Sequence, residues 1–108
     1  GLEARKALYR ARMAFLDAAF ARLGLEALVA PAHRSASVRS LRLPAGIAYA
    51  ALHDRVKRDG YVIYAGLGDA ARTSFRVCAL GNLSVRALEG FVDSLETALE
   101  REGGLVGA

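Results

Sequence analysis

The stretch TSFRVCALGNLS, residues 73–84, has the pattern of a buried β-strand that runs into a turn. Phe75, Val77 and the apolar residues after them suit a protein interior, whereas Arg76 in their middle does not. An arginine keeps its charge in a protein, so a buried guanidinium needs an anion close by. Arg76 therefore either lies on a solvent-exposed face of the strand or binds a negatively charged partner.

The sequence before this strand predicts three further strands. YVIY, residues 61–64, is β-branched and aromatic, and AGLGDAART, residues 65–73, predicts the loop that follows it. LEALVAP, residues 25–31, ends at a proline and predicts an edge strand. SVRSLRLP, residues 37–44, alternates with the period of a strand. Its two sets of side chains are Val38, Ser40 and Arg42 on one face, and Arg39, Leu41 and Leu43 on the other.

Three helices alternate with these strands along the chain, over residues 2–23, 47–59 and 84–101. Gly24 and Gly60 end the first two, and Ser84 is a good N-cap for the third. The first helix carries a continuous apolar stripe at steps of three and four residues: Tyr9, Met13, Leu16, Phe20 and Leu23. The order αββαββα predicts an α/β fold of the α+β type. In it, a small, mostly antiparallel sheet of about four strands has helices on one face.

The size and composition predict one globular domain, residues 1–108, without a disulfide framework. The chain has one cysteine, Cys78, which favours a reducing, cytoplasmic compartment. No run of about 18 uncharged apolar residues is present, so we expect no contact with a membrane. The net charge is +4, but the basic residues are scattered without interleaved aromatic residues, which argues against nucleic acid. The chain starts in or beside a helix without an N-cap, which predicts a piece of a longer protein.

Most catalytic and metal-binding patterns are missing. His33 and His53 do not form a metal site with one cysteine, and we expect both to be solvated. The serines have no nucleophile elbow around them. The G-x-G pair in residues 65–69 lacks a P-loop lysine and predicts a turn. Cys78 lies two residues from Arg76, hence on the same strand face, where a packed small side chain is the simpler interpretation.

Two alternatives for Arg76 follow from the pattern alone. The side chain either reaches water or pairs with a local acid, as strand arginines do. Otherwise it is a rigid, bidentate clamp for a carboxylate or phosphonate, held by the strand and followed by Gly81, which permits a close approach.

Two segments together resemble a known family. DRVKRDGYVIYAG, residues 54–66, followed by SFRVCALGNLS, residues 74–84, resembles the C-terminal small domain of class V (fold type I) pyridoxal-phosphate aminotransferases. Within this family the similarity is to the 2-aminoethylphosphonate–pyruvate transaminases, and it extends from about Leu2 to Glu100. The resemblance implies that Arg76 binds the acidic group of the substrate beside the cofactor. It also implies a homodimeric parent enzyme that moves the amino group of 2-aminoethylphosphonate to pyruvate, giving phosphonoacetaldehyde and alanine.

The same resemblance implies that the chain is inactive alone. Catalysis by these enzymes requires a lysine that forms a Schiff base with pyridoxal phosphate. Lys6 and Lys57 are the only lysines, and neither matches the family's cofactor lysine. We therefore expect no catalytic and no cofactor-binding residue here, and a large cofactor domain as the partner. The loop at residues 65–73 departs from the family's version, which leaves the amino donor open.

A different class of function stays open. A free-standing basic α/β module for an acidic ligand or protein partner predicts a self-sufficient polar surface and anion binding without another domain. A nucleic-acid-binding protein predicts a steep dependence of affinity on salt. A detached aminotransferase domain predicts instead an exposed apolar patch and no activity.

Overall fold

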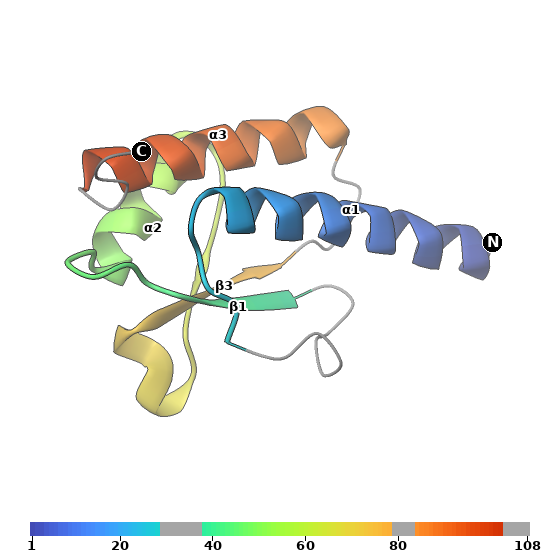
Figure 1. The fold of residues 1–108 in the computed structure, drawn as a ribbon. Helices are drawn as coiled ribbons and strands as arrows, with labels where there is room; N and C mark the ends of the chain where they lie inside the picture. Colours follow the sequence, from blue (N-terminus) through green and yellow to red (C-terminus); the bar gives the residue numbers. More distant parts are fainter. Residues whose placement is uncertain (29–37, 79–83, 103–108) are drawn as a thin grey trace.

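The computed structural model describes residues 1–28, 38–78 and 84–102 (Figure 1). The predictions for His33, Pro31 and Gly81 therefore lie outside the described residues. The elements are the helices α1 (Leu2–Arg22), α2 (Tyr49–Arg58) and α3 (Val85–Arg101), the short 3-10 helix η2 (Gly68–Arg72), and the strands β1 (Val38–Arg42), β2 (Tyr64–Ala65) and β3 (Ser74–Cys78).

The three strands form one antiparallel sheet in the order β1-β3-β2. The α+β class and the antiparallel sheet are confirmed, but the predicted fourth strand is not. Of residues 25–31, the described part contributes a single bridge, between Ala27 and Leu41. The strand predicted at residues 61–64 is shorter than expected, because the Tyr61 amide donates to the Val56 carbonyl and so continues the end of α2.

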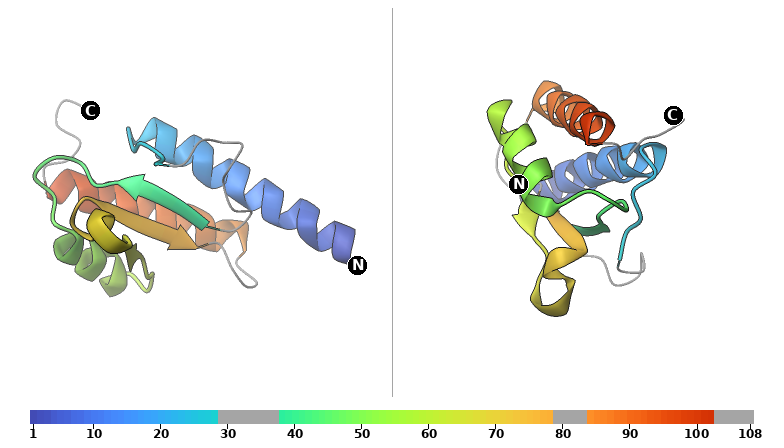
Figure 2. Two further views of the ribbon diagram at one scale, coloured as in Figure 1. Left: turned by 90° about the horizontal axis from the view of Figure 1, so that it is seen from below. Right: turned by 90° about the vertical axis from the view of Figure 1, so that its left-hand side faces the viewer.

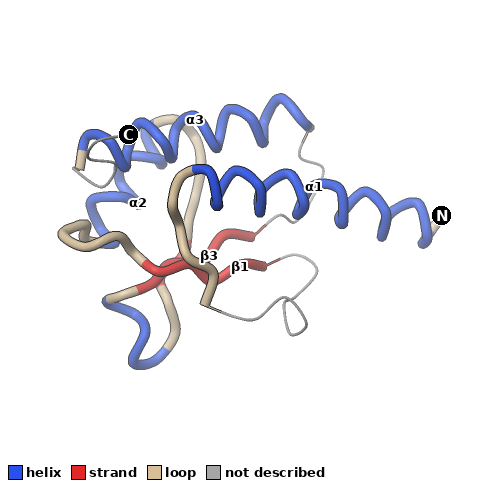
Figure 3. Tube along the Cα trace, in the orientation of Figure 1, coloured by secondary structure: helices blue, strands red, loops and turns tan. Residues whose placement is uncertain are grey.

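The three α-helices lie on one side of the sheet, as Figures 1 and 2 show from three directions. In the tube drawing of Figure 3 the strands lie below α1 and α3, and η2 extends away from the helices. The core fills the space between the two layers. Its fully buried members include Leu16 from α1, Leu41 and Phe75 from the sheet, and Leu95 and Leu99 from α3. Burial of these apolar side chains is the main term that stabilises the domain.

Helix α1 is only partly covered by the rest of the domain. Its predicted stripe is buried from Met13 onward, whereas the first turns are exposed and project past the sheet (Figure 1). Gly24 follows with φ +76°, a left-handed conformation that glycine adopts readily. At the start of α3, the Ser84 hydroxyl accepts from the Ala87 amide at 3.0 Å, as its N-cap position predicts.

Candidate functional site

The two faces of the sheet carry different chemistry. Because side chains alternate along a strand, β1 and β3 each divide into a covered and an open set. Leu41, Phe75 and Val77 point toward the helices and are buried. The open face carries Ser40, Arg42, Tyr64, Arg76 and Cys78, none of which is fully buried.

Arg39 lies on the covered face and pairs with α1. It is only 8% exposed, and its Nε and Nη2 donate to Asp17 Oδ1 and Oδ2 at 2.7 and 3.1 Å. Nη1 donates to the Val38 carbonyl at 3.0 Å. Arg39 therefore does not share the open face of the sheet with Arg42 and Arg76. Its alternation with Leu41 already placed it on the apolar face.

Arg76 lies on the open face, in the middle strand. In the register of the sheet it stands between Ser40 on β1 and Tyr64 on β2. The side chain is half-buried, and its Nε donates to the Ala65 carbonyl at 2.9 Å. The guanidinium carbon lies 5.9 Å from the centre of the Tyr64 ring, within the range of a cation–π contact. No carboxylate of the described residues forms an ion pair with it.

The loop between β2 and β3 fixes the position of the Ala65 carbonyl, which accepts the hydrogen bond from Arg76. Gly66, next to Ala65, is buried and its amide donates to the Ser74 carbonyl at 3.2 Å. A Cβ on Gly66 would collide with Ser74 Oγ and would lie 2.5 Å from the Ala70 carbonyl oxygen. Ser74 Oγ donates to that same oxygen at 2.6 Å. The loop predicted at residues 65–73 therefore begins in β2 and contains η2, and only glycine fits at position 66.

Tyr49 on α2 lies within the electrostatic reach of the open face. Its hydroxyl donates to the Ile63 carbonyl at 3.1 Å. Burial raises the pKa of Tyr49 above the ordinary value of 10.0, the positive charge of Arg76 opposes this rise, and Asp54 and Tyr64 add to it. Tyr49 therefore stays neutral at physiological pH and acts here as a hydrogen-bond donor.

The other positive charge of the open face is already paired. Arg42 Nε donates to Glu26 at 3.0 Å in an exposed ion pair. Cys78 is half-buried on the same face as Arg76, as predicted, and is not part of a disulfide. Arg76 is thus the guanidinium of this face that has no acidic partner among the described residues.

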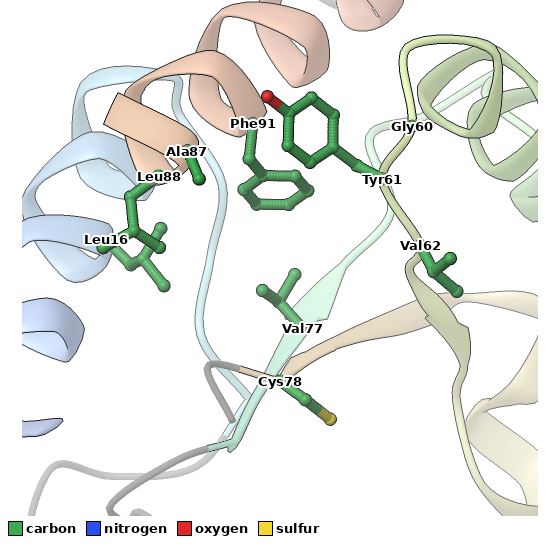
Figure 4. Close-up of a pocket in the computed structure, with 9 residues that line it drawn as sticks. All are labelled: Leu16, Gly60, Tyr61, Val62, Val77, Cys78, Ala87, Leu88 and Phe91. Atoms are coloured by element: carbon green, nitrogen blue, oxygen red, sulfur yellow. The ribbon is translucent and has the colours of Figure 1, made fainter. Parts of the chain in front are cut away.

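An apolar cavity of about 160 Å³ lies beside the strand, between β3, α1, α3 and the segment after α2. Figure 4 shows Val77, Leu88 and Phe91 around it, with Tyr61 at its edge. The Cys78 sulfur points away from Val77 in this view, as the alternation of the strand requires. Tyr61 and Cys78 are the only polar side chains among the described residues that line it, so the cavity offers little side-chain chemistry.

Both lysines of the chain lie exposed on helices. Lys6 is exposed on α1 and lies 4.0 Å from Glu3, and Lys57 is exposed near the end of α2. The described residues also include no group of three or more potential metal ligands. His53 is half-buried, contacts the Tyr49 ring at 5.5 Å between centroids and lies beside Asp54, so it is less solvated than predicted.

The sequence is similar to that of two curated transaminases. It is 32% identical over 105 residues to 2-aminoethylphosphonate–pyruvate transaminase 1 of Polaromonas sp., and 30% identical over 105 residues to 2-aminoethylphosphonate–pyruvate transaminase of Syntrophobacter fumaroxidans. Each alignment covers 95% of this chain and 28% of the relative. The chain thus spans little more than a quarter of the length of these proteins. No protein-family model matches it.

The fold is shared with solved aminotransferases. Ureidoglycine–glyoxylate aminotransferase from Bacillus subtilis superposes with a TM-score of 0.89 and 24% identity, over 99% of this chain and 29% of that protein. Pyridoxamine–pyruvate aminotransferase from Mesorhizobium loti gives a TM-score of 0.85 and 22% identity, over 95% and 27% of the two chains. The chain is therefore similar in sequence to part of two transaminases, and it shares its fold with part of solved aminotransferases. The predicted resemblance is confirmed.

Among the described helices, none combines the length and the apolar character that a bilayer span requires.

Proposed function

We propose that this chain is the small domain of a pyridoxal-phosphate-dependent transaminase that acts on 2-aminoethylphosphonate and pyruvate, and that Arg76 binds the anionic group of the substrate. The names of the two similar transaminases support the reaction. The state of Arg76 supports its role: the strand and the Ala65 carbonyl hold the guanidinium, yet no described carboxylate neutralises it.

A guanidinium held in this way suits a phosphonate or a carboxylate. Its planar array of N–H groups matches two oxygens of either anion, and each hydrogen bond is strengthened by both charges. Arg76 leaves water only partly, so the protein does not need to supply a permanent counter-ion. Binding of the substrate would then complete the pairing that the described residues leave open.

The chemistry of amino transfer belongs to the part of the enzyme outside this chain. Lys6 and Lys57 are both exposed on helices, which supports our proposal that the cofactor is held by a larger domain. The isolated chain should accordingly bind no cofactor and catalyse nothing. A homodimeric, cytoplasmic parent enzyme is part of the same proposal.

The experiment compares two arginines of the open face in the full-length enzyme. Arg76→Ala removes the proposed clamp, whereas Arg42→Ala removes an equal charge that is already paired with Glu26. We expect Arg76→Ala to lower kcat/KM for 2-aminoethylphosphonate by about 100-fold, because a charge-assisted bidentate contact is lost. Arg76→Lys should recover little, since lysine offers no planar fork.

The Arg42→Ala control should stay within about threefold of wild type, as loss of an exposed charge changes little. Equal effects of Arg76→Ala and Arg42→Ala would contradict the proposal. Anion binding by the 108-residue chain alone, with the affinity of the full enzyme, would favour a free-standing binding module instead.

A further inference from the structure

Resting on the proposed function, we infer that Tyr64 is a positioning residue that, with the Ala65 carbonyl, makes Arg76 receive the substrate anion end-on, through its two Nη groups. Tyr64 and Ala65 are the two residues of β2, the short edge strand beside β3. A side chain and a carbonyl from consecutive residues therefore contact one guanidinium.

The Ala65 carbonyl determines which edge of the guanidinium is open. An arginine can meet a two-oxygen anion through its Nε and one Nη, or through its two Nη groups. Arg39 shows the first mode in this same sheet, with Nε and Nη2 on the two oxygens of Asp17. In Arg76 the Nε hydrogen already points to the Ala65 carbonyl at 2.9 Å. The edge formed by the two Nη groups is left for the substrate.

Tyr64 restricts the guanidinium from one face. Its ring centre lies 5.9 Å from the guanidinium carbon, and the residue is 45% exposed, so it stands at the surface where a ligand approaches. A ring in this position attracts the cation and limits its swing out of the plane that the Ala65 bond defines. We expect the ring to reduce the freedom that Arg76 would lose when the anion binds.

The hydroxyl of Tyr64 has no part in this argument, which gives a matched set of variants. Tyr64→Phe keeps the ring, Tyr64→Leu keeps apolar bulk without a ring, and Tyr64→Trp offers a stronger aromatic face. Each is tested in the full-length enzyme with 2-aminoethylphosphonate as amino donor. n-Propylamine, which carries a methyl group in place of the phosphonate, serves as the second donor.

Tyr64→Leu should raise KM for 2-aminoethylphosphonate about fivefold with kcat within about twofold, because a cation–π contact at a half-exposed site is lost. Tyr64→Phe and Tyr64→Trp should stay within about twofold of wild type. The kcat/KM for n-propylamine should not change in any of them. A merely structural role would lower the rates of both donors together, and an unchanged melting temperature checks the fold.

The outcomes separate this inference from the proposed function. If Arg76→Ala weakens the anionic donor but Tyr64→Leu equals Tyr64→Phe, the role of Tyr64 is overturned and that of Arg76 stands. If Arg76→Ala has no effect, the proposed function falls whatever Tyr64 does. A bound-state structure in which Nε leaves the Ala65 carbonyl for the anion would overturn the end-on mode. Should Tyr64→Leu fail to fold, Tyr64→Thr provides a ring-free, β-branched strand residue in its place.

Discussion

Arg39 and Arg76 are the same residue type on neighbouring strands, yet the two faces of the sheet give them opposite surroundings. Arg39 faces the helices, and the Asp17 carboxylate neutralises its charge and accepts two hydrogen bonds from it. Arg76 faces away from them, and its contacts are a backbone carbonyl and an aromatic ring. The Arg39–Asp17 ion pair links α1 to the sheet. The second arrangement orients a cation and leaves its charge available, which is the property of a binding group.

The largest effect on stability is expected from breaking the covered pair. Asp17→Ala leaves the nearly buried Arg39 without its carboxylate, so we expect the free energy of unfolding to fall by about 3 kcal/mol. Equilibrium urea unfolding of the chain measures this change. The double variant Asp17→Ala/Arg39→Met removes the orphaned charge too and should recover most of the loss. A double variant that is less stable than Asp17→Ala would contradict a simple pairing role.

A smaller loss is expected at the turn that holds the acceptor of Arg76. Gly66→Ala places a methyl group against Ser74 Oγ and the Ala70 carbonyl, and should cost about 2 kcal/mol of unfolding free energy. Ser74→Ala alone loses one hydrogen bond and should cost about 1 kcal/mol. The double variant should relieve only part of the clash, because the Ala70 backbone remains. If the double variant were no less stable than Ser74→Ala alone, the backbone at Ala70 would be easier to displace than the contacts indicate.

The smallest effects on stability are expected on the open face. Arg76→Ala removes one hydrogen bond and a half-exposed ring contact, so the free energy of unfolding should change by at most about 1 kcal/mol. Arg42→Ala, which breaks an exposed pair, should stay within about 0.5 kcal/mol of wild type. Thermal and urea unfolding of both variants, beside Asp17→Ala, test the order. If Arg76→Ala lowered the free energy of unfolding as much as Asp17→Ala does, Arg76 would be a structural residue like Arg39, which would contradict the comparison.

The elements that depend on local patterns were predictable from the sequence. The stripe of α1 and the glycine after it gave its bounds almost to the residue, and Ser84 marked the start of α3. The strand at residues 61–64 was not predicted correctly, because the end of α2 competes for the Tyr61 amide. Propensity alone carries no information about that competition.

For the candidate site, the sequence drew attention to Arg76 but did not predict the surroundings of that side chain. The charge of Arg76 within an apolar strand singled it out, and the strand period placed Cys78 on the same face. The partner of Arg39 is Asp17, 22 positions earlier on a different element, and no local pattern joins them. Likewise, the contacts of Tyr64 and Ala65 with Arg76 arise from the pairing of β2 with β3, which is a long-range property of the fold.

The most direct test of the account is a crystal structure of the full-length enzyme with bound 2-aminoethylphosphonate. We expect both Nη groups of Arg76 to lie within about 3 Å of phosphonate oxygens, the distance of a charge-assisted hydrogen bond, while Nε keeps the Ala65 carbonyl. An acidic side chain of the larger domain paired with Arg76, with the phosphonate bound elsewhere, would contradict the account. Arg76 would then be a second structural arginine, like Arg39.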